Sequence, residues 1–166
     1  ADTPVHGSTA NYAVMLGKDI ELGGWFADAD DLASRAVAVI GWDVKDELFP
    51  LQDPIGRTFT IDGVPFRIVG VVAQQGNVLG QTEDNHVYVP MSTYRKTWGT
   101  RNSIDMMIRA RGGVPGVEAS IDEVRAVLRA LRHTPFRAPD PFGVVTAESL
   151  QDLWRQISAA AFILTF

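Results

Sequence analysis

The side chains best suited to acid–base or metal chemistry in this sequence are its three histidines, His6, His86 and His133. They lie far apart along the chain. None is followed four residues later by a second histidine, and none stands in the H-E-x-x-H pattern that places two metal ligands on one helix face. Folding could bring them together, but a histidine that is hydrogen bonded within the fold or faces solvent is the simpler interpretation of each.

Acidic side chains gather at two places, residues 28–31 and residues 83–86. The first run, D-A-D-D, lacks the glycine and the closing glutamate of a calcium loop, so a helix cap or a solvated turn explains it better. The second run, E-D-N-H, could hold a metal, but a polar loop that leads into a strand explains it with fewer assumptions. A carboxylate pair for hydrolysis stays open, because the separation of the two groups is a property of the fold.

No other pattern indicates an active site. The chain has no cysteine, which excludes thiol catalysis, disulfides and cysteine-bound zinc without identifying the compartment. No serine stands in the G-x-S-x-G pattern of a nucleophile elbow. The sequence therefore predicts no catalytic, cofactor-binding or metal-binding residues.

Glycine recurs every seventh residue in the stretch PIGRTFTIDGVPFRIVGVVAQQG, at Gly56, Gly63 and Gly70. A dinucleotide-binding loop needs its glycines in G-x-G-x-x-G spacing between a strand and a helix, and this stretch does not have that spacing. The residues between the glycines alternate or branch as in strands, and Asp62-Gly63 is a turn signal. The pattern predicts an antiparallel hairpin over 54–72, with structural rather than ligand-binding glycines.

Length and charge narrow the class of protein. A chain of 166 residues suits one domain or two small subdomains, and 46% hydrophobic residues indicate a folded protein. The net charge is −5, and no run of lysine or arginine is present that would neutralise a row of phosphates. Nucleic acid is therefore excluded as a partner.

The order of expected elements is mixed. The clearest is a helix over 116–132, because its apolar residues recur at spacings of three and four. Residues 73–85 form a polar loop whose length is uncommon unless the loop is functional or mobile. We expect strands within the 54–72 hairpin and over 35–40, 86–89, 104–109 and 142–145. We expect further helices over 43–49, 92–98 and 147–157.

The C-terminal segment 157–166, ISAAAFILTF, contains almost no polar residue. Ten residues are too few to span a bilayer, which needs about 20. The segment is either a core helix or the beginning of a transmembrane helix. The amphipathic helix before it favours the second interpretation, because its apolar face leads directly into the tail. That face consists of Leu150, Leu153, Trp154 and Ile157.

The ordered set of motifs resembles the extracytoplasmic core domain of MacB-like (FtsX-like) ABC transporter permeases. The chain begins with V-x-G-S-T-x-x-Y over residues 5–12, followed by A-V-A-V-I-G over 36–41 and the Pro54-Ile55-Gly56 hairpin. HVYVP, MMIRARGG, EVRAVLRALR and VTAESLQDLWRQIS continue the likeness to about residue 160. No single motif is specific, but their order is.

The resemblance implies an α+β fold in two lobes. Residues 20–100 would form a mostly β, membrane-distal lobe, and residues 1–19 with 101–157 a membrane-proximal βα lobe. Residues 158–166 would begin a transmembrane helix. Many relatives have Gly-Arg where this chain has Gly24-Trp25, so no role of that arginine is carried over. Relatives also begin with a strand and a helix before the V-x-G segment, so the proximal lobe would lack part of its sheet, and an open edge could pair with another copy.

For function, the resemblance implies a non-enzymatic module that transmits ATP-driven motion to a substrate or a partner protein, in efflux, in lipoprotein or peptide export, or in cell-envelope remodelling. The expected partners are a second permease copy, a cytoplasmic ATPase that carries ATP and Mg, and a membrane-fusion adaptor or cell-envelope protein. The segment would lie outside the bacterial cell membrane, in the periplasm or at the cell surface. The helix at 147–157 would be the lever to the membrane.

The expected partner contact is the 73–85 loop, through Gln74, Gln75, Asn77, Leu79 and Gln81. A loop that is merely flexible remains the competing interpretation. The alternative function is a soluble enzyme or ligand-binding domain with a carboxylate or histidine site assembled by the fold, which predicts convergent polar groups in a pocket. A third interpretation is a structural spacer in a cell-envelope complex.

Overall fold

The computed structural model describes residues 3–78, 81–82, 84–101, 103–146, 148–149, 151 and 155. The chain divides into two compact units, Ala1–Met107 and Ile108–Phe166. Each unit is described by itself. The combination of helices with a mixed sheet confirms the predicted α+β class.

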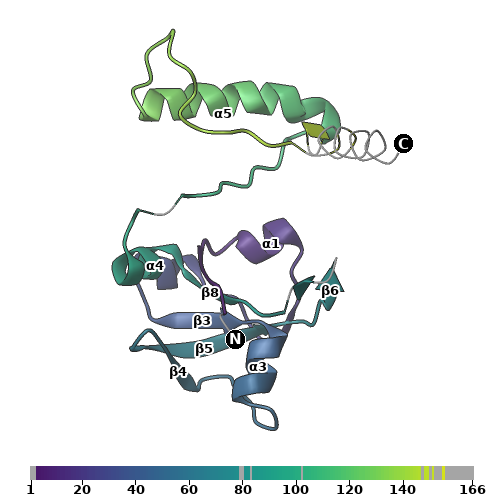
Figure 1. The fold of residues 1–166 in the computed structure, drawn as a ribbon, viewed down its shortest axis with the longest axis vertical. Coiled ribbons are helices and arrows are strands. Elements are labelled where there is room, and N and C mark those ends of the chain that lie inside the picture. Colours follow the sequence, from purple (N-terminus) through teal and green to yellow (C-terminus); the bar gives the residue numbers. More distant parts are fainter. Residues whose placement is uncertain are drawn as a thin grey trace, which may run out of the picture. The chain divides into compact units, whose positions relative to one another are not determined.

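A six-stranded sheet forms the first unit (Figure 1). Its strands follow the order β1 (Val5–Ser8), β8 (Val87–Pro90), β3 (Val37–Ile40), β5 (Val64–Val72) and β2 (Ile20–Gly23), and β4 (Thr58–Ile61) pairs with β5 beside this path. The pairs β1/β8 and β3/β5 are parallel, and the other pairs are antiparallel.

Four short helices accompany this sheet. They are α1 (Tyr12–Leu16), α2 (Asp28–Leu32), α3 (Trp42–Leu48) and α4 (Met91–Trp98). Helices α3 and α4 lie close to the predicted ranges, whereas β1, α1, β2 and α2 were not predicted, because four or five residues are too few to show a period. The predicted 73–85 loop contains a small antiparallel pair, β6 (Asn77–Val78) with β7 (Gln81–Thr82).

The sheet is buried on both faces, so β3 and β8 read as continuous hydrophobic runs rather than alternating ones. Side chains of one parity, such as Ile40, Phe66 and Val89, form one core cluster. Side chains of the other parity, such as Val39 and Tyr88, form a second cluster with Phe26. The two clusters hold the sheet as the middle layer of the unit.

The 54–72 segment is an antiparallel hairpin, as the sequence indicates, with β4 and β5 joined at Asp62-Gly63. Gly56 and Gly63 have φ values of +79° and +82°, which side chains rarely adopt. Gly70 is different, because a Cβ added there would lie against the carbonyl oxygen of Gly24, far inside van der Waals contact. Two of the glycines thus serve backbone conformation and the third serves close approach.

The position of the front segment differs from the predicted lobe division. Residues 1–19 were expected to lie with 101–157, but β1 pairs with β8 within the sheet of the first unit. The physical reason is the parallel ladder from Val5 opposite Val87 to Ser8 opposite Pro90, which joins segments about 80 residues apart in sequence. The membrane-distal and membrane-proximal assignments stay predictions.

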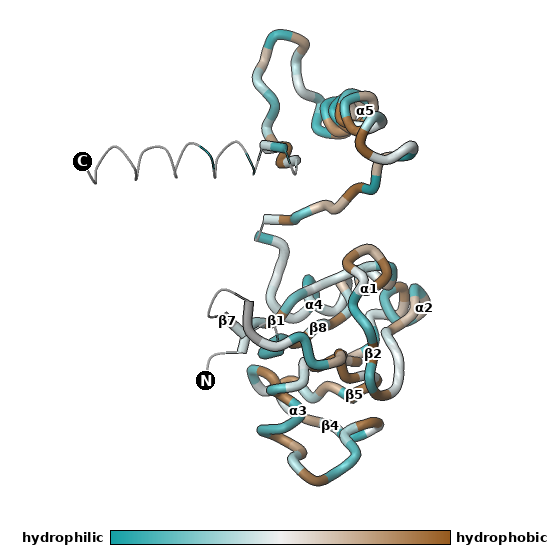
Figure 2. The backbone as a smooth tube through the Cα atoms, turned by 90° about the vertical axis from the view of Figure 1, so that its right-hand side faces the viewer, coloured by the Kyte–Doolittle hydropathy of each residue, from teal (hydrophilic) through white to brown (hydrophobic). Residues whose placement is uncertain are grey.

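The second unit contains η1 (Val114–Gly116) and the helix α5 (Val117–Leu131), which matches the predicted helix. No residue of α5 is fully buried, and Figure 2 shows hydrophobic and hydrophilic positions side by side along it. The helix is amphipathic, but its apolar stripe is only half covered.

Two predicted strands are wrong. The described residues of 104–109 and 142–145 form no strand. A strand needs a neighbour for its backbone groups, and no strand pairing reaches either segment in the described chain. The apolar side chains at Ile104, Met106 and Ile108 are instead about half exposed.

The expected membrane lever falls largely outside the described residues. Residues 148, 149, 151 and 155 are helical, which agrees with a helix in this region. Leu150, Leu153, Trp154 and Ile157 lie outside the described residues, as does the segment 158–166. Among the residues that are described, no helix has the length and apolar character needed to cross a bilayer.

Candidate functional site

The sheet register brings two of the three histidines together. His6 on β1 lies opposite Tyr88 on β8, and His86 precedes Tyr88 by two residues, which places it on the same face of the sheet. Nε2 of His6 and Nδ1 of His86 are 3.1 Å apart and share a hydrogen bond. The third histidine, His133, follows α5 in the other unit.

An aromatic cluster surrounds this histidine pair. The His6 ring stacks on Tyr88, with centroids 5.6 Å apart and an angle of 28° between the planes. Tyr12 and Trp25 pack against Tyr88 in turn. Trp25 thus has a structural place in the cluster, and its indole N–H donates to the Thr9 carbonyl oxygen at 3.4 Å.

One lysine faces the same cluster. Lys18 lies 5.8 Å from the centroid of the Tyr88 ring and donates to Oε1 of Gln75 at 3.1 Å. The pKa of His6 is lowered, first by removal of solvent around the ring and then by the charges of His86 and Lys18. Each of these effects disfavours the imidazolium form of His6.

These side chains line an open cavity of about 280 Å³. Its lining residues are His6, Tyr12, Leu16, Lys18, Gln75, His86 and Tyr88. The cavity combines aromatic surface with a cation and two imidazoles, and it includes Gln75 from the predicted partner loop. It is therefore a surface suited to recognition rather than an enclosed reaction chamber.

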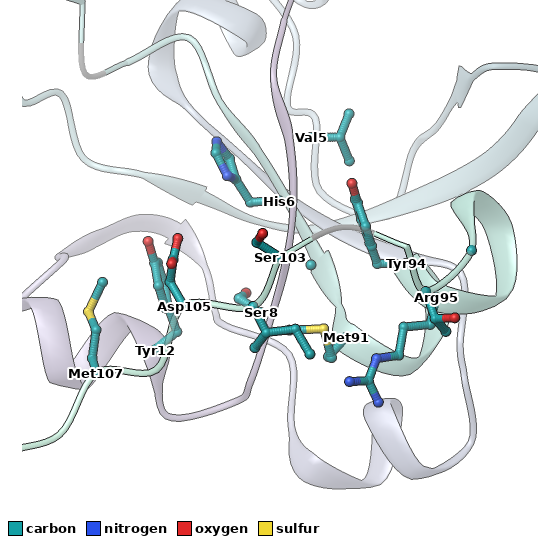
Figure 3. Close-up of a pocket in the computed structure, with 14 residues that line it drawn as sticks. Val5, His6, Ser8, Tyr12, Met91, Tyr94, Arg95, Ser103, Asp105 and Met107 are labelled. Atoms are coloured by element: carbon teal, nitrogen blue, oxygen red, sulfur yellow. The ribbon is translucent and has the colours of Figure 1, made fainter. Parts of the chain in front are cut away.

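A second cavity, of about 230 Å³, adjoins β1 and shares His6 and Tyr12 with the first (Figure 3). Its wall includes Ser8 from β1, Met91 and Tyr94 from α4, and residues that follow α4, among them Ile104 and Asp105. Ser8 is only 4% exposed, and its hydroxyl has no hydrogen-bond partner among the described groups. A buried hydroxyl without a partner is costly, so Ser8 is an energetically unfavourable feature of this wall.

The predicted partner loop is fixed at its base by Asp84. This carboxylate is 3% exposed, and it accepts hydrogen bonds from the backbone N–H groups of Gln75 at 2.7 Å and Gly76 at 2.8 Å. Its own backbone is tied to Thr82, and the Thr82 hydroxyl donates to Asp43 at the start of α3. The loop therefore leaves the sheet from a rigid base.

The structure separates the five predicted contact residues. Gln74 and Gln75 are exposed at the base of the loop, and Gln75 meets Lys18. The backbones of Asn77 and Gln81 belong to the β6/β7 pair, and Leu79 lies outside the described residues. The structural importance of Lys18, Ser8 and Asp84 was missed. A signal for Asp84 existed in the acidic stretch 83–86, but its partners are backbone groups that no motif identifies.

The described residues offer little for catalysis. No group of three or more histidine, aspartate or glutamate side chains converges on a common point within the described chain. The cavity shared by the two histidines has no carboxylate among its described lining residues, whereas Asp105 lines the second cavity together with His6. No hydrogen bond between His6 and Asp105 is present to orient the ring as in a triad.

Comparison with known proteins identifies the fold and the family. The family model of the MacB-like periplasmic core domain matches residues 1–131. The crystal structure of the periplasmic region of MacB from Actinobacillus actinomycetemcomitans superposes with a TM-score of 0.71 at 19% identity, covering 91% of this chain and 64% of that one. The extracellular domain of the noncanonic ABC-type transporter YknZ from Gram-positive bacteria has a TM-score of 0.61 at 19% identity, covering 79% and 65%.

Curated relatives agree. The pyoverdine export ATP-binding/permease protein PvdT of Pseudomonas aeruginosa is 34% identical over 124 residues, 72% of this chain and 19% of that protein. The macrolide export ATP-binding/permease protein MacB of Bdellovibrio bacteriovorus is 32% identical over 126 residues, 74% of this chain and 19% of that protein. The chain thus spans about a fifth of the length of these relatives. Its resemblance is confirmed: the chain belongs to the family of MacB-like periplasmic core domains.

Proposed function

We propose that this chain is the extracytoplasmic domain of an ABC transporter permease and transmits ATP-driven motion to an exported substrate or a partner protein. Family membership supports this function, and so do the names of the relatives, which are export ATP-binding/permease proteins. The domain itself is non-catalytic. ATP and Mg belong to an associated cytoplasmic ATPase, and the permease works with a second copy of itself.

The observation that carries the proposal is the rigid connection between the sheet and the exposed loop. A sheet buried on both faces moves as one body, since packed cores are not continuously deformable. Asp84 joins the backbone at Gln75 and Gly76 to this body through two hydrogen bonds. Motion of the sheet is therefore passed to the 73–85 loop, where a membrane-fusion adaptor or a cell-envelope protein would bind.

The enzyme alternative has less support. It needs a carboxylate or a nucleophile hydrogen bonded to a histidine, and although Ser8 and Asp105 share a cavity with His6, the hydrogen bond of His6 goes to His86. The spacer interpretation predicts that the loop surface is irrelevant. Substitution of that surface distinguishes it from transmission.

The test is an export assay on the complete transporter in membranes, with ATPase activity measured alongside. The double variant Gln74→Glu/Gln75→Glu changes the charge of the loop base, and we expect export to fall by about tenfold, as for a central interface position. ATPase activity without substrate should be unchanged. Gln52→Glu is the matched control, because Gln52 is an exposed glutamine on another loop.

The variant Asp84→Asn distinguishes the transmission of motion to the loop from the binding of a partner by the loop. It removes the charge that holds the loop base and leaves the exposed side chains in place, so export should fall while partner capture persists. Full export by both the double variant and Asp84→Asn would exclude the loop as the point of coupling. Full export after deletion of the domain would reject the proposed function itself.

A further inference from the structure

The pairing of β1 with β8 creates a two-histidine arrangement that the transport role does not explain. We propose that His6 and His86 form a binding site for one late first-row transition-metal ion, such as Zn²⁺ or Cu²⁺, with Nε2 of His6 and Nδ1 of His86 as the two protein ligands. This inference does not depend on the proposed function. A metal could bind here whatever the loop contacts.

The spacing of the two nitrogens fits a shared metal. Two imidazole nitrogens bound to one zinc at about 2.0–2.1 Å with a tetrahedral angle lie about 3.3–3.4 Å apart. With a square-planar angle, which Cu²⁺ prefers, the separation falls to about 2.9 Å. The observed separation of 3.1 Å lies between these values and is therefore compatible with a shared ion.

The rings are held in place before any ion arrives. His6 is stacked on Tyr88, and His86 lies 6.1 Å from the same ring, centroid to centroid. The backbone carbonyl of His86 is bound by the N–H of Gly41 at 2.8 Å, which fixes its main chain. Preorganised ligands lose little conformational freedom on binding, and this favours chelation over two independent contacts.

The protonation change needed for binding is small. In the hydrogen-bonded pair one of the two facing nitrogens carries a hydrogen, and that ring must adopt its other tautomer so that both lone pairs reach the metal. No net proton is released if both rings are neutral beforehand.

The remaining metal positions belong to solvent or to an external ligand. No third histidine, aspartate or glutamate joins the pair among the described residues, so the site is open on the side of the cavity. Imidazole suits Zn²⁺, Cu²⁺ and Ni²⁺, whereas Mg²⁺ requires oxygen ligands. Two protein ligands leave most of the coordination sphere to exchangeable groups, which suits reversible occupancy.

Substitution of Lys18 is a useful test, because the proposal predicts the direction in which the metal affinity changes. The Lys18 side chain lines the same cavity as both histidine rings, so its ammonium charge opposes a second cation at the pair. Replacing it by methionine keeps the aliphatic stem and removes the charge. The affinity for Zn²⁺ should then rise by about threefold, the size expected of one partly screened charge.

The experiment is a calorimetric titration of the whole chain with ZnCl₂, repeated with CuSO₄ and MgCl₂. We expect one equivalent of Zn²⁺ and of Cu²⁺ to bind, with Cu²⁺ tighter, and no binding of Mg²⁺. His6→Gln and His86→Gln should each weaken Zn²⁺ binding by at least about tenfold, since loss even of an outer-shell partner costs that much. His133→Gln, the matched control in the other unit, should bind as the parent does.

Nitrogen-15 spectra of the histidine rings then identify the ligating atoms, which should be Nε2 of His6 and Nδ1 of His86. The proposal is overturned if the parent shows no saturable binding, if both glutamine variants retain it, or if Mg²⁺ binds equally well. Should a glutamine variant fail to fold by circular dichroism, Lys18→Met decides, because it keeps both rings. Tighter binding supports the site, and unchanged or weaker binding rejects it.

Discussion

Each of the two units of this molecule is stabilised internally by a different kind of contact. Every buried hydrophobic residue among those described lies in the first unit, and all but Ala13 belong to the two clusters on either face of the sheet. In the second unit, no residue of α5 is fully buried. Among the described residues, the first unit thus has a buried hydrophobic core, whereas the helix of the second unit contributes no buried side chain.

Polar contacts take the place of that core in the second unit. Arg129 donates to the carbonyl oxygens of Pro135, Phe136 and Ala138 and pairs with Asp140 at 2.5 Å. Arg125 reaches the same carboxylate at 3.0 Å. One arginine therefore fixes the chain that follows α5, and such contacts are weaker than burial because water competes for them. A long, regular helix such as α5 is therefore not in itself evidence that its unit is stable.

The largest expected effect is a loss of stability in the first unit only. Phe66 is fully buried and stacks on Trp98, so Phe66→Ala should lower the free energy of unfolding by about 3–5 kcal/mol. Phe136→Ala is the control, because that ring is 97% exposed in the second unit. Urea denaturation checks both variants. Equal losses would show that burial does not distinguish the units.

A smaller effect is expected at the close approach in the sheet. Gly70→Ala would press a methyl group onto the Gly24 carbonyl, and should destabilise the first unit by about 1–3 kcal/mol. Gly143→Ala in the second unit meets no atom within 4 Å and should be neutral. Thermal unfolding of the two variants is the measurement, and a neutral Gly70→Ala would mean that the strands separate easily.

The smallest effect concerns Asp140 and its pH dependence. The hydrogen bond from Arg129 lowers the pKa of Asp140 below its usual value of 3.8, with a further contribution from Arg125. A lowered native pKa stabilises the folded form above 3.8, and this stabilisation is lost as the pH falls through the lower native value. Parent and Asp140→Asn should therefore differ at neutral pH and converge in acid.

Amide hydrogen exchange along α5, followed from neutral to acid pH, checks this expectation. Asp122→Asn is a suitable control, because that carboxylate is 78% exposed and makes one ion pair, with Arg125. A pH dependence equally strong in both variants would assign the effect to general charge rather than to the arginine contacts.

Local features of the fold could be predicted from the sequence. The 54–72 hairpin follows from alternation and a turn signal, and α5 follows from its apolar spacing, because both depend on neighbours close in the chain. The 104–109 and 142–145 segments have the same strand-like composition but no pairing in the described structure. Composition records a tendency to pair, whereas a strand exists only where a partner is present.

The candidate site could not be predicted from local sequence patterns, because its residues come from distant segments of the chain. His6 and His86 are 80 residues apart, and only the β1/β8 ladder makes them neighbours. A strand was expected at 86–89, but nothing in the sequence connected it with residues 5–8. Asp84 stood in a recognised acidic stretch, yet its backbone partners depend on how the chain returns to the sheet.

The β1/β8 ladder also sets an order of events during synthesis. β1 leaves the ribosome first, but its partner follows about 80 residues later, after the other strands of the sheet have been made. Contacts so distant in sequence form late, because the entropy cost of closing a long loop comes before the stabilising contacts are made. The edge that carries His6 is therefore the last part of the sheet to assemble. Until then a newly made chain offers an unpaired strand, and a chaperone that binds extended segments would find it there.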